Sequence, residues 1–290
     1  MPAVLRPLRE SDLPFAHGLS RAAGWNQTRR DWERFLFLAP GGCFLAMDDG
    51  CPAGTATTTA YRDDLAWIGM VLVEPAFRRR GIGTALLEAA IGHLRERGKV
   101  ACIRLDATPQ GRPLYEGLGF FAEWNLRRWV RNAAPTTAPT ATSAPDPPLS
   151  DPDDGAETVL PASSLALDRA VFGADRSLLL ASLRTGSDDA ILLPDGSFGF
   201  RRAGERAHYL GPVTAASNAS GLALAERLLS RCPHDRPLFW DLPEANESAS
   251  DLAFRLGFEP ARVLTRMRLG EDTARQDPAR IFGLAEPGLG

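Results

Sequence analysis

Apolar positions along residues 1–132 follow two periods, which predict both strands and helices. The continuous apolar run at 66–73 is typical of a strand that is buried on both faces, and 100–107 is expected to be another buried strand. Between them, apolar residues recur at the 3.6-residue spacing of a helix, at Ile82, Leu86, Leu87, Ala90, Ile91 and Leu94. Strands are also expected at 42–47 and 52–61, which flank the turn sequence Asp48-Asp49-Gly50. This order predicts an α+β fold, a mixed central sheet flanked by helices.

One segment breaks this pattern and divides the chain. Residues 133–156 contain six prolines and four aspartates but no basic residue. Such a composition cannot bury enough apolar surface to offset its ordering entropy, and its prolines favour an extended chain. At 290 residues the chain is also longer than one core needs. We therefore expect domains at 1–132 and 157–290, joined by a linker at 133–156.

The second half repeats the order of elements in the first. Residues 208–214 are expected to form a central strand, 222–229 a helix, and 238–242 the next strand. The sequence Leu252–Phe258 then parallels Leu114–Phe120, because both end in Gly-Phe. The second domain is therefore expected to be related to the first.

Composition and charge exclude several classes of function. Hydrophobic residues make up 44% and charged residues 24%, which is ordinary for a soluble globular protein. The net charge of −3 argues against a broad nucleic-acid-binding surface, and no apolar run is long enough to span a bilayer. Because the N-terminus also lacks a signal peptide, we expect a cytoplasmic protein without nucleic-acid or membrane partners. The cysteines and histidines lack metal-ligand spacing, so no metal site is expected. The sequence does not indicate an oligomeric state.

The strongest chemical signal is a loop between the 66–73 strand and the following helix. It reads Arg78-Arg79-Arg80-Gly81-Ile82-Gly83-Thr84. A helix N-terminus presents unpaired N–H groups and a partial positive charge, which attract a phosphate. The two glycines let the backbone approach a bulky anion, and the arginines add positive charge. Neither the dinucleotide fingerprint nor a P-loop lysine is present.

The pattern Arg78-x-x-Gly81-x-Gly83 resembles the [QR]xxGx[GA] signature of the GCN5-related N-acetyltransferases. The resemblance spans about residues 3–131 and includes Pro75 and the segment 105–120 with its Gly-Phe ending. It implies that acetyl-CoA is a co-substrate. The backbone of Val71, Leu72 and Val73 would bind the pantetheine arm, and residues 78–84 would surround the pyrophosphate. Thr108 stands where the family frequently has an asparagine that contacts the cofactor.

The resemblance also implies roles for residues nearer the reacting groups. Tyr115 lies four residues before Gly119, where the family often places a tyrosine that assists the departing CoA thiolate. The alternative for Tyr115 is an aromatic core residue whose hydroxyl reaches the surface. Trp25, Asn26 and Gln27 lie in a region that commonly lines the acceptor site; the alternative is a turn with a buried tryptophan. No general base is assigned, because Glu74, Asp63 and Asp64 are typical solvated carboxylates.

The second half lacks this chemistry. Aligning Gly69 with Gly211 places Ser220–Ala225 opposite Arg78–Gly83, so the arginines and both glycines are absent there. Ala253 takes the position of Tyr115. The layout resembles tandem acetyltransferases with a degenerate C-terminal lobe. We expect an N-acetyltransferase that acts on an amine of a small molecule. The alternatives are a protein-lysine acetyltransferase and a non-catalytic acyl-CoA-binding module.

Overall fold

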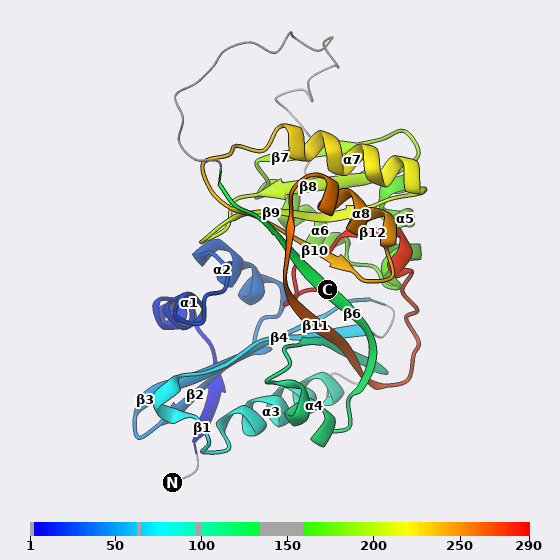
Figure 1. The fold of residues 1–290 in the computed structure, drawn as a ribbon. Helices are drawn as coiled ribbons and strands as arrows, with labels where there is room; N and C mark the ends of the chain where they lie inside the picture. The colour runs from blue at the N-terminus through cyan, green and yellow to red at the C-terminus, as the bar shows by residue number, and fades with distance from the viewer. Residues whose placement is uncertain (1–2, 63–64, 97–99, 134–158) are drawn as a thin grey trace.

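A single sheet runs through both halves of the protein. The computed structural model describes residues 3–62, 65–96, 100–133 and 159–290, so all but the first residue of the predicted linker at 133–156 lies outside the described residues. The sheet has twelve strands in the order β1-β2-β3-β4-β5-β11-β6-β10-β9-β8-β7, with β12 paired to β9 (Figure 1). The predicted mixed sheet flanked by helices is confirmed.

The first half contributes one end of the sheet and four helices. Its strands are β1 (Val4–Pro7), β2 (Cys43–Asp48), β3 (Cys51–Ala60), β4 (Leu65–Val73), β5 (Cys102–Ala107) and β6 (Phe121–Arg131). The helices α1 (Leu13–Ala22) and α2 (Arg29–Leu38) lie on one face of the sheet, and α3 (Ile82–Glu96) and α4 (Arg112–Gly117) lie on the other (Figure 1). Short 3₁₀ turns at Glu10–Asp12 and Pro75–Phe77 precede α1 and α3. Thr28 caps α2 by accepting a hydrogen bond from the Asp31 N–H, as Ser and Thr caps commonly do.

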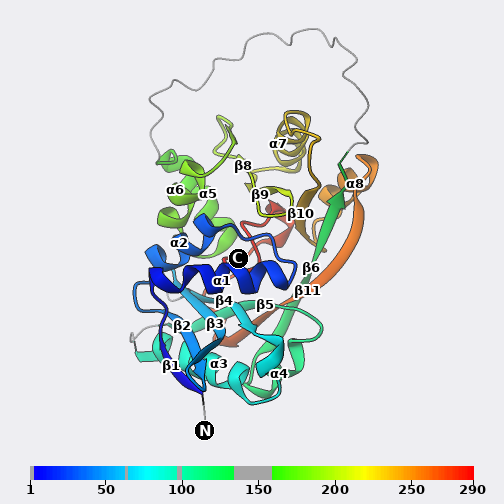
Figure 2. The ribbon, with the colours of Figure 1, turned by 90° about the vertical axis from the view of Figure 1, so that its left-hand side faces the viewer.

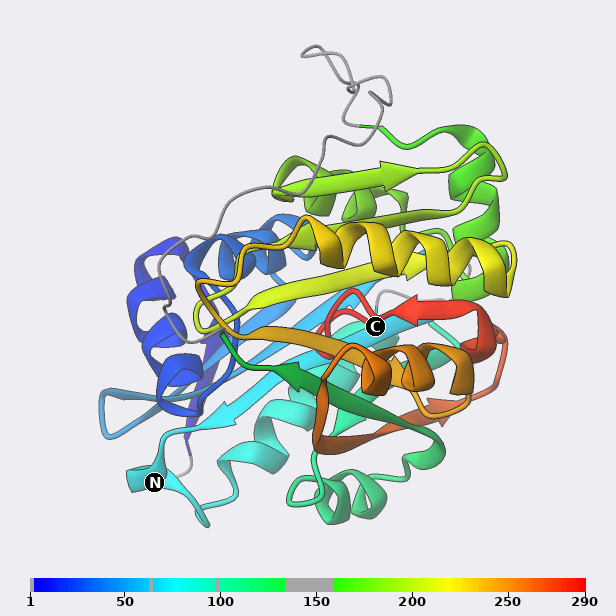
Figure 3. The same ribbon diagram turned by 45° about the horizontal axis from the view of Figure 1, so that its top comes forward.

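From its first helix to β11, the second half repeats the order of helices and strands from α1 to β6, as predicted from the sequence, and it then adds a further strand, β12. It comprises α5 (Ala162–Phe172), α6 (Ser177–Thr185), β7 (Asp189–Leu192), β8 (Phe198–Arg202), β9 (His208–Thr214), α7 (Asn218–Ser230), β10 (Leu238–Pro243), α8 (Glu247–Arg255), β11 (Glu259–Gly270), a 3₁₀ turn (Pro278–Arg280) and β12 (Ile281–Gly283). The helices α5 and α6 lie on one side of β8 and β9, and α7 lies on the other (Figures 2 and 3). None of the described helices is both long and apolar enough to cross a membrane.

The two halves exchange their last strands. β11 from the second half pairs antiparallel with β5, with Thr265 opposite Ala107. β6 from the first half pairs antiparallel with β10, with Trp240 opposite Trp129. β6 and β11 also pair with each other, and both cross from one half to the other in Figures 1 and 2. Each half therefore completes the sheet of the other.

The halves also share a hydrophobic core. One cluster joins Trp32 and Phe35 of the first half to Phe172, Leu179 and other apolar side chains of the second. The segment after β12 is held between them: the Tyr61 hydroxyl donates to the Leu289 carbonyl at 2.7 Å, and the Trp67 indole donates to that of Pro287 at 3.0 Å. The end of the chain accordingly lies in the middle of the molecule (Figure 1).

Candidate active site

β4 and β5 diverge and open a wedge in the sheet. They pair in parallel only from Leu65 to Trp67, opposite Cys102 to Arg104. Beyond Trp67, β4 contains a bulge, in which Met70 adopts a left-handed φ of 51° and two residues of β4 face one of β3. A bulge bends its strand and leaves ladder groups unpaired. The backbone after Trp67 consequently turns away from β5, and Val71, Leu72 and Val73 face the wedge.

A cavity of about 370 Å³ occupies this wedge and extends between the two halves. It brings together nine of the residues predicted for the site, namely Trp25, Gln27, Val71, Leu72, Val73, Arg78, Gly83, Thr108 and Tyr115. Its other walls include residues that sequence reasoning missed, among them Asp106, Arg262, Leu264, Pro287 and Gly288. Four of these five missed residues come from the exchanged strand β11 and the C-terminal segment.

The loop before α3 has the backbone shape of an anion site. Arg79 and Gly81 both have left-handed φ values, 62° and 79°. A Cβ atom built on Gly81 meets nothing within 4 Å, so the space beside this backbone is open. Gly83 lies in the first turn of α3, where helical N–H groups lack partners within the helix. This geometry fits a bound pyrophosphate.

The three arginines of the loop are not equivalent. Arg78 lines the cavity and donates through Nε to the Val73 carbonyl at 3.1 Å. Arg80 turns to the β2–β3 hairpin, where it pairs with Asp48 at 3.0 Å and lies over the Phe77 ring. Arg79 is exposed. The side chain of Ile82 is buried in the core beside Leu86, so only its backbone faces the loop; Thr84 is half-buried in α3 and does not line the cavity.

Tyr115 projects from α4 into the cavity. Its ring lies against Gly111: a Cβ there would lie 3.1 Å from the ring and 3.5 Å from the hydroxyl oxygen. Burial raises the pKa of Tyr115 to about 12, so its hydroxyl keeps its proton at neutral pH. Thr108, at the end of β5, accepts a hydrogen bond from the Gly111 N–H at 3.1 Å and thereby shapes the turn into α4.

The three residues predicted for the acceptor side, Trp25, Asn26 and Gln27, do not all reach the cavity. Trp25 and Gln27 line it, whereas Asn26 points into the second half. The Asn26 carboxamide accepts hydrogen bonds from the N–H groups of Arg206 and Ala207, both at 2.9 Å, and donates to the Ala207 carbonyl at 3.1 Å. The side chain of Asn26 is therefore used in joining the halves. Of the three, only Trp25 and Gln27 can contact a molecule in the cavity.

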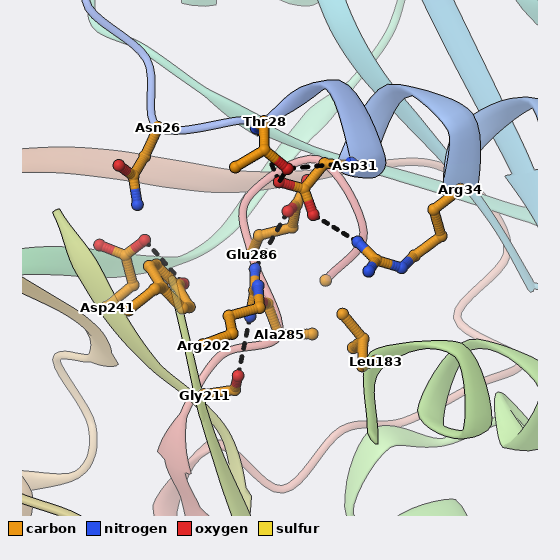
Figure 4. A network of polar contacts seen from close by, with 12 residues as sticks. Asn26, Thr28, Asp31, Arg34, Leu183, Arg202, Gly211, Asp241, Ala285 and Glu286 are labelled. Carbon is orange, nitrogen blue, oxygen red and sulfur yellow. Dashed lines mark hydrogen bonds and ion pairs between the residues drawn. The ribbon is translucent and has the colours of Figure 1, made fainter. Parts of the chain in front are cut away.

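A buried polar network beside Asn26 fixes the C-terminal segment next to the cavity (Figure 4). Arg202 pairs with Glu286 at 3.1 Å and donates to the carbonyls of Gly211 and Ala285, both at 2.8 Å. Burial and the nearby Asp31 carboxylate raise the pKa of Glu286 to about 7, against the opposing effect of Arg202. The network holds Pro287 and Gly288 against β4, where a Cβ on Gly69 would lie 2.5 Å from the Gly288 carbonyl oxygen.

No free carboxylate is found among the described residues that line the cavity. Asp106 is the one acidic residue in that lining, and both of its oxygens accept hydrogen bonds from Arg266 at 2.9 Å. Burial raises the pKa of Asp106, against the opposing effect of Arg266. Glu74 does not line the cavity, and Asp63 and Asp64 lie outside the described residues.

The second half has the same wedge, but the chain itself fills it. β9 and β10 pair in parallel only from His208 to Leu210. β12 then pairs with β9, placing Gly283 opposite Val213, and the Leu284 N–H donates to the Asp241 carbonyl at 3.0 Å. With Gly211 aligned to Gly69, Val213 corresponds to Val71. The backbone groups that are open in the first half are thus covered in the second.

Comparisons with known proteins identify the family of the chain. The model of the acetyltransferase (GNAT) family matches residues 7–120, and that of an acetyltransferase (GNAT) domain matches residues 164–283. Holothin acyltransferase from Pseudoalteromonas sp. is 24% identical over 87% of this chain and 82% of its own length. The ribosomal protein bS18-alanine N-acetyltransferase of Escherichia coli is 33% identical over 46% of this chain and 88% of its own length. The crystal structure of a putative acetyltransferase from Pyrococcus horikoshii superposes with a TM-score of 0.81, at 24% identity, over 100% of this chain and 96% of that one. The chain therefore belongs to the GNAT acetyltransferase family as a tandem member, and it is an acyltransferase that uses acetyl-CoA.

Proposed function

We propose that the protein transfers the acetyl group of acetyl-CoA to the amine of a small molecule in the wedge of the first half. The observation that carries the proposal is the single cavity that joins Val71–Val73, the loop residues Arg78 and Gly83, Tyr115, and the acceptor-side residues Trp25 and Gln27. In this arrangement the backbone of β4 binds the pantetheine arm. The first turn of α3 binds the pyrophosphate, because its N–H groups and dipole favour an anion.

The transfer forms a C–N bond and breaks the thioester C–S bond. The free amine attacks the carbonyl carbon, the electron pair of the C–S bond leaves on sulfur, and the Tyr115 hydroxyl stabilises the departing thiolate by donating a hydrogen bond to it. The amine loses its proton to water, the thiolate takes one from the solvent, and Tyr115 keeps its own. Tyr115 suits this role because burial raises its pKa to about 12 and keeps it protonated up to alkaline pH.

Replacing Tyr115 by phenylalanine is expected to lower kcat by about 10- to 100-fold. We expect a small loss for this kind of catalysis because the thiol has a pKa of only about 8.5, so its thiolate is already a good leaving group. Steady-state kinetics with release of free thiol as the readout measures the effect. The KM for acetyl-CoA should change little, since the ring that packs on Phe120 is retained. A loss confined to KM would instead assign Tyr115 to binding.

A small acceptor is favoured by the way in which the second half closes the site. Arg262, Leu264, Pro287 and Gly288 form part of the cavity wall and limit the space for a polypeptide. The relative named for holothin matches over most of this chain, whereas the one named for a ribosomal protein matches less than half of it. A protein acceptor is the alternative, and it predicts acetylated peptides in a digest of treated cell extract.

The direct test incubates the purified full chain with acetyl-CoA and a panel of amines while free thiol is followed. Thiol release that depends on an amine, with the acetylated amine identified by mass spectrometry, is the expected result. Calorimetry measures acetyl-CoA binding separately. Binding without turnover on any amine or peptide contradicts the proposed reaction, and absence of binding contradicts the proposed site.

We also expect one acetyl-CoA per chain, although the sequence contains two related halves. In the second half β12 pairs with the backbone of β9, in the place where acetyl-CoA would bind. Phe282 fills the space beside Gly221: a Cβ on Gly221 would lie 2.4 Å from the Phe282 ring. Isothermal titration with CoA should give a stoichiometry near one. A stoichiometry of two would show that β12 is displaced and that the second wedge binds CoA.

A further inference from the structure

The second half supplies one charged side chain to the acceptor side of the cavity. Arg262 lies on β11, just after an irregularity in the pairing of β11 with β6 at Pro260. It lines the cavity with Leu264, two residues further along the same strand, and with Trp25 and Gln27 of the first half. Side chains two residues apart on a strand share a face. Arg262 thus faces the space that the proposed acceptor would occupy.

Arg262 forms no ion pair with a carboxylate among the described residues, although the charge of the nearby Asp241 favours its protonated form. The residue opposite it on β6 is another arginine, Arg128. Asp241, the carboxylate beside them, already accepts three hydrogen bonds: one oxygen accepts from Arg128 at 2.7 Å, and the other accepts from Arg128 at 2.6 Å and from the Tyr209 hydroxyl at 2.9 Å. The Nε of Arg262 is buried without a hydrogen-bond partner in the described part of the protein.

This arrangement is unfavourable for the protein alone. Like charges opposite each other on neighbouring strands repel, and a buried donor without an acceptor costs free energy. Burial and the charge of Arg128 lower the pKa of Arg262 to about 10, against the opposing effects of Asp241 and Tyr209, and the guanidinium remains charged at neutral pH. Its charge and donors are available to a ligand that brings its own anion.

The other titratable residues that line the cavity do not offset this charge. Arg78 is also cationic and lies at the loop end, where it donates to the Val73 carbonyl. Asp106 is paired with Arg266, and Tyr115 is neutral. A simple amine, which is a cation before it loses its proton, would be repelled by Arg262. An acceptor that carries an anionic group as well as the amine would match the cavity.

We infer that the acceptor is an amine that also carries a carboxylate, and that Arg262 binds this carboxylate and so determines acceptor specificity. The inference rests on the proposed acetyl transfer. A carboxylate is favoured over a phosphate because one planar guanidinium matches the two oxygens and single charge of a carboxylate.

The test compares matched acceptors that differ in the carboxylate. One set pairs the common L-amino acids with their primary amides, and another pairs linear ω-amino acids with alkylamines of equal length. The variants are R262Q, R262K and, as a control, R127Q on the neighbouring strand, whose arginine pairs with Glu244 at the surface. For the wild type we expect kcat/KM to favour the best carboxylate-bearing acceptor by about 10- to 100-fold over its partner.

In R262Q this preference should vanish because kcat/KM falls for the acid alone. The kcat/KM for the amide and the affinity for acetyl-CoA should not change, and R127Q should keep the preference of the wild type. R262K should recover part of the preference. The melting temperature of R262Q should be equal or higher, because an unpaired charge is removed, whereas a structural role would lower it. Equal losses for the acid and the amide overturn the inference. So does a preference for phosphoethanolamine, an amine that carries a phosphate in place of the carboxylate. If the protein binds acetyl-CoA but neither binds nor acetylates any carboxylate-bearing amine, the inference about the carboxylate is wrong and the proposed function still stands. Failure to bind acetyl-CoA overturns the proposed function itself.

Discussion

Valine at position 81 is expected to weaken acetyl-CoA binding by on the order of 1,000-fold, through loss of two or more hydrogen bonds from the loop to the pyrophosphate. Gly81 has a φ of 79°, and the space beside its Cα is open. A β-branched residue is strongly disfavoured at such a φ, and its side chain would occupy the space proposed for the anion. Isothermal titration calorimetry with acetyl-CoA measures the loss.

The chain offers a matched control for this substitution. Gly257 has a φ of 76°, is likewise exposed and also has nothing within 4 Å of its added Cβ, but it lies in the second half before Phe258. Both valine variants should lose about 1–2 kcal/mol of stability from the same backbone strain. Only the change at Gly81 should affect acetyl-CoA. If both variants bind it equally well, the pyrophosphate lies elsewhere.

The elements around this loop could be predicted because their signals are local. The buried strand before Arg78, the glycines, and the helical spacing from Ile82 lie within about thirty residues of each other in the sequence. The position of Tyr115 before Gly119 is also a local spacing. Each of these predictions depends on neighbours in the chain, and the structure places Tyr115 and the loop residues Arg78 and Gly83 along one cavity.

The exchange of β6 and β11 could not be predicted in this way. A strand's own pattern shows which of its faces is buried, but not which strand it pairs with. Either last strand could complete either half, since the two halves have the same order of elements. Consequently Arg262 and Leu264, on β11, gave no sequence signal for the first half's cavity. Pro287 and Gly288 were missed for the same reason, because their contacts are with β4.

The case of Asn26 shows a second limit. Three successive residues were assigned to the acceptor side, but successive side chains point in opposite directions in a strand, and in a loop they need not share a direction. Trp25 and Gln27 reach the cavity, and Asn26 between them reaches the backbone of Ala207. Alternation alone would have split the three residues into two groups. It would not have indicated which group faces the cavity.

Replacing Arg266 by methionine is expected to destabilise the protein by about 3–5 kcal/mol, the usual cost of breaking a buried pair. The side chains of Arg266 and Asp106 are both 0% exposed, and the guanidinium lies between Trp67 and Trp124 at 4.4 and 4.2 Å from their ring centres. The pair joins β11 to β5 beside the cavity. Its loss leaves the Asp106 carboxylate buried without its partner, and urea denaturation measures the change in the free energy of unfolding.

The pH dependence of this variant distinguishes the ion pair from simple packing. Without Arg266, burial and the carboxylates of Asp241 and Glu123 act unopposed on Asp106 and raise its folded-state pKa further above the unfolded value of about 3.9. The folded variant then holds a proton that the unfolded chain releases, so its stability should fall as pH rises above about 4. The deficit relative to wild type should be larger at pH 8 than at pH 5.

The double variant D106L/R266M should recover much of the loss, because no buried charge remains. Arg29→Met, which breaks an exposed pair with Glu33, should cost no more than about 0.5 kcal/mol. A pH-independent deficit in R266M that the double variant does not reduce would mean that Arg266 stabilises this junction by stacking on the two tryptophans rather than by its charge.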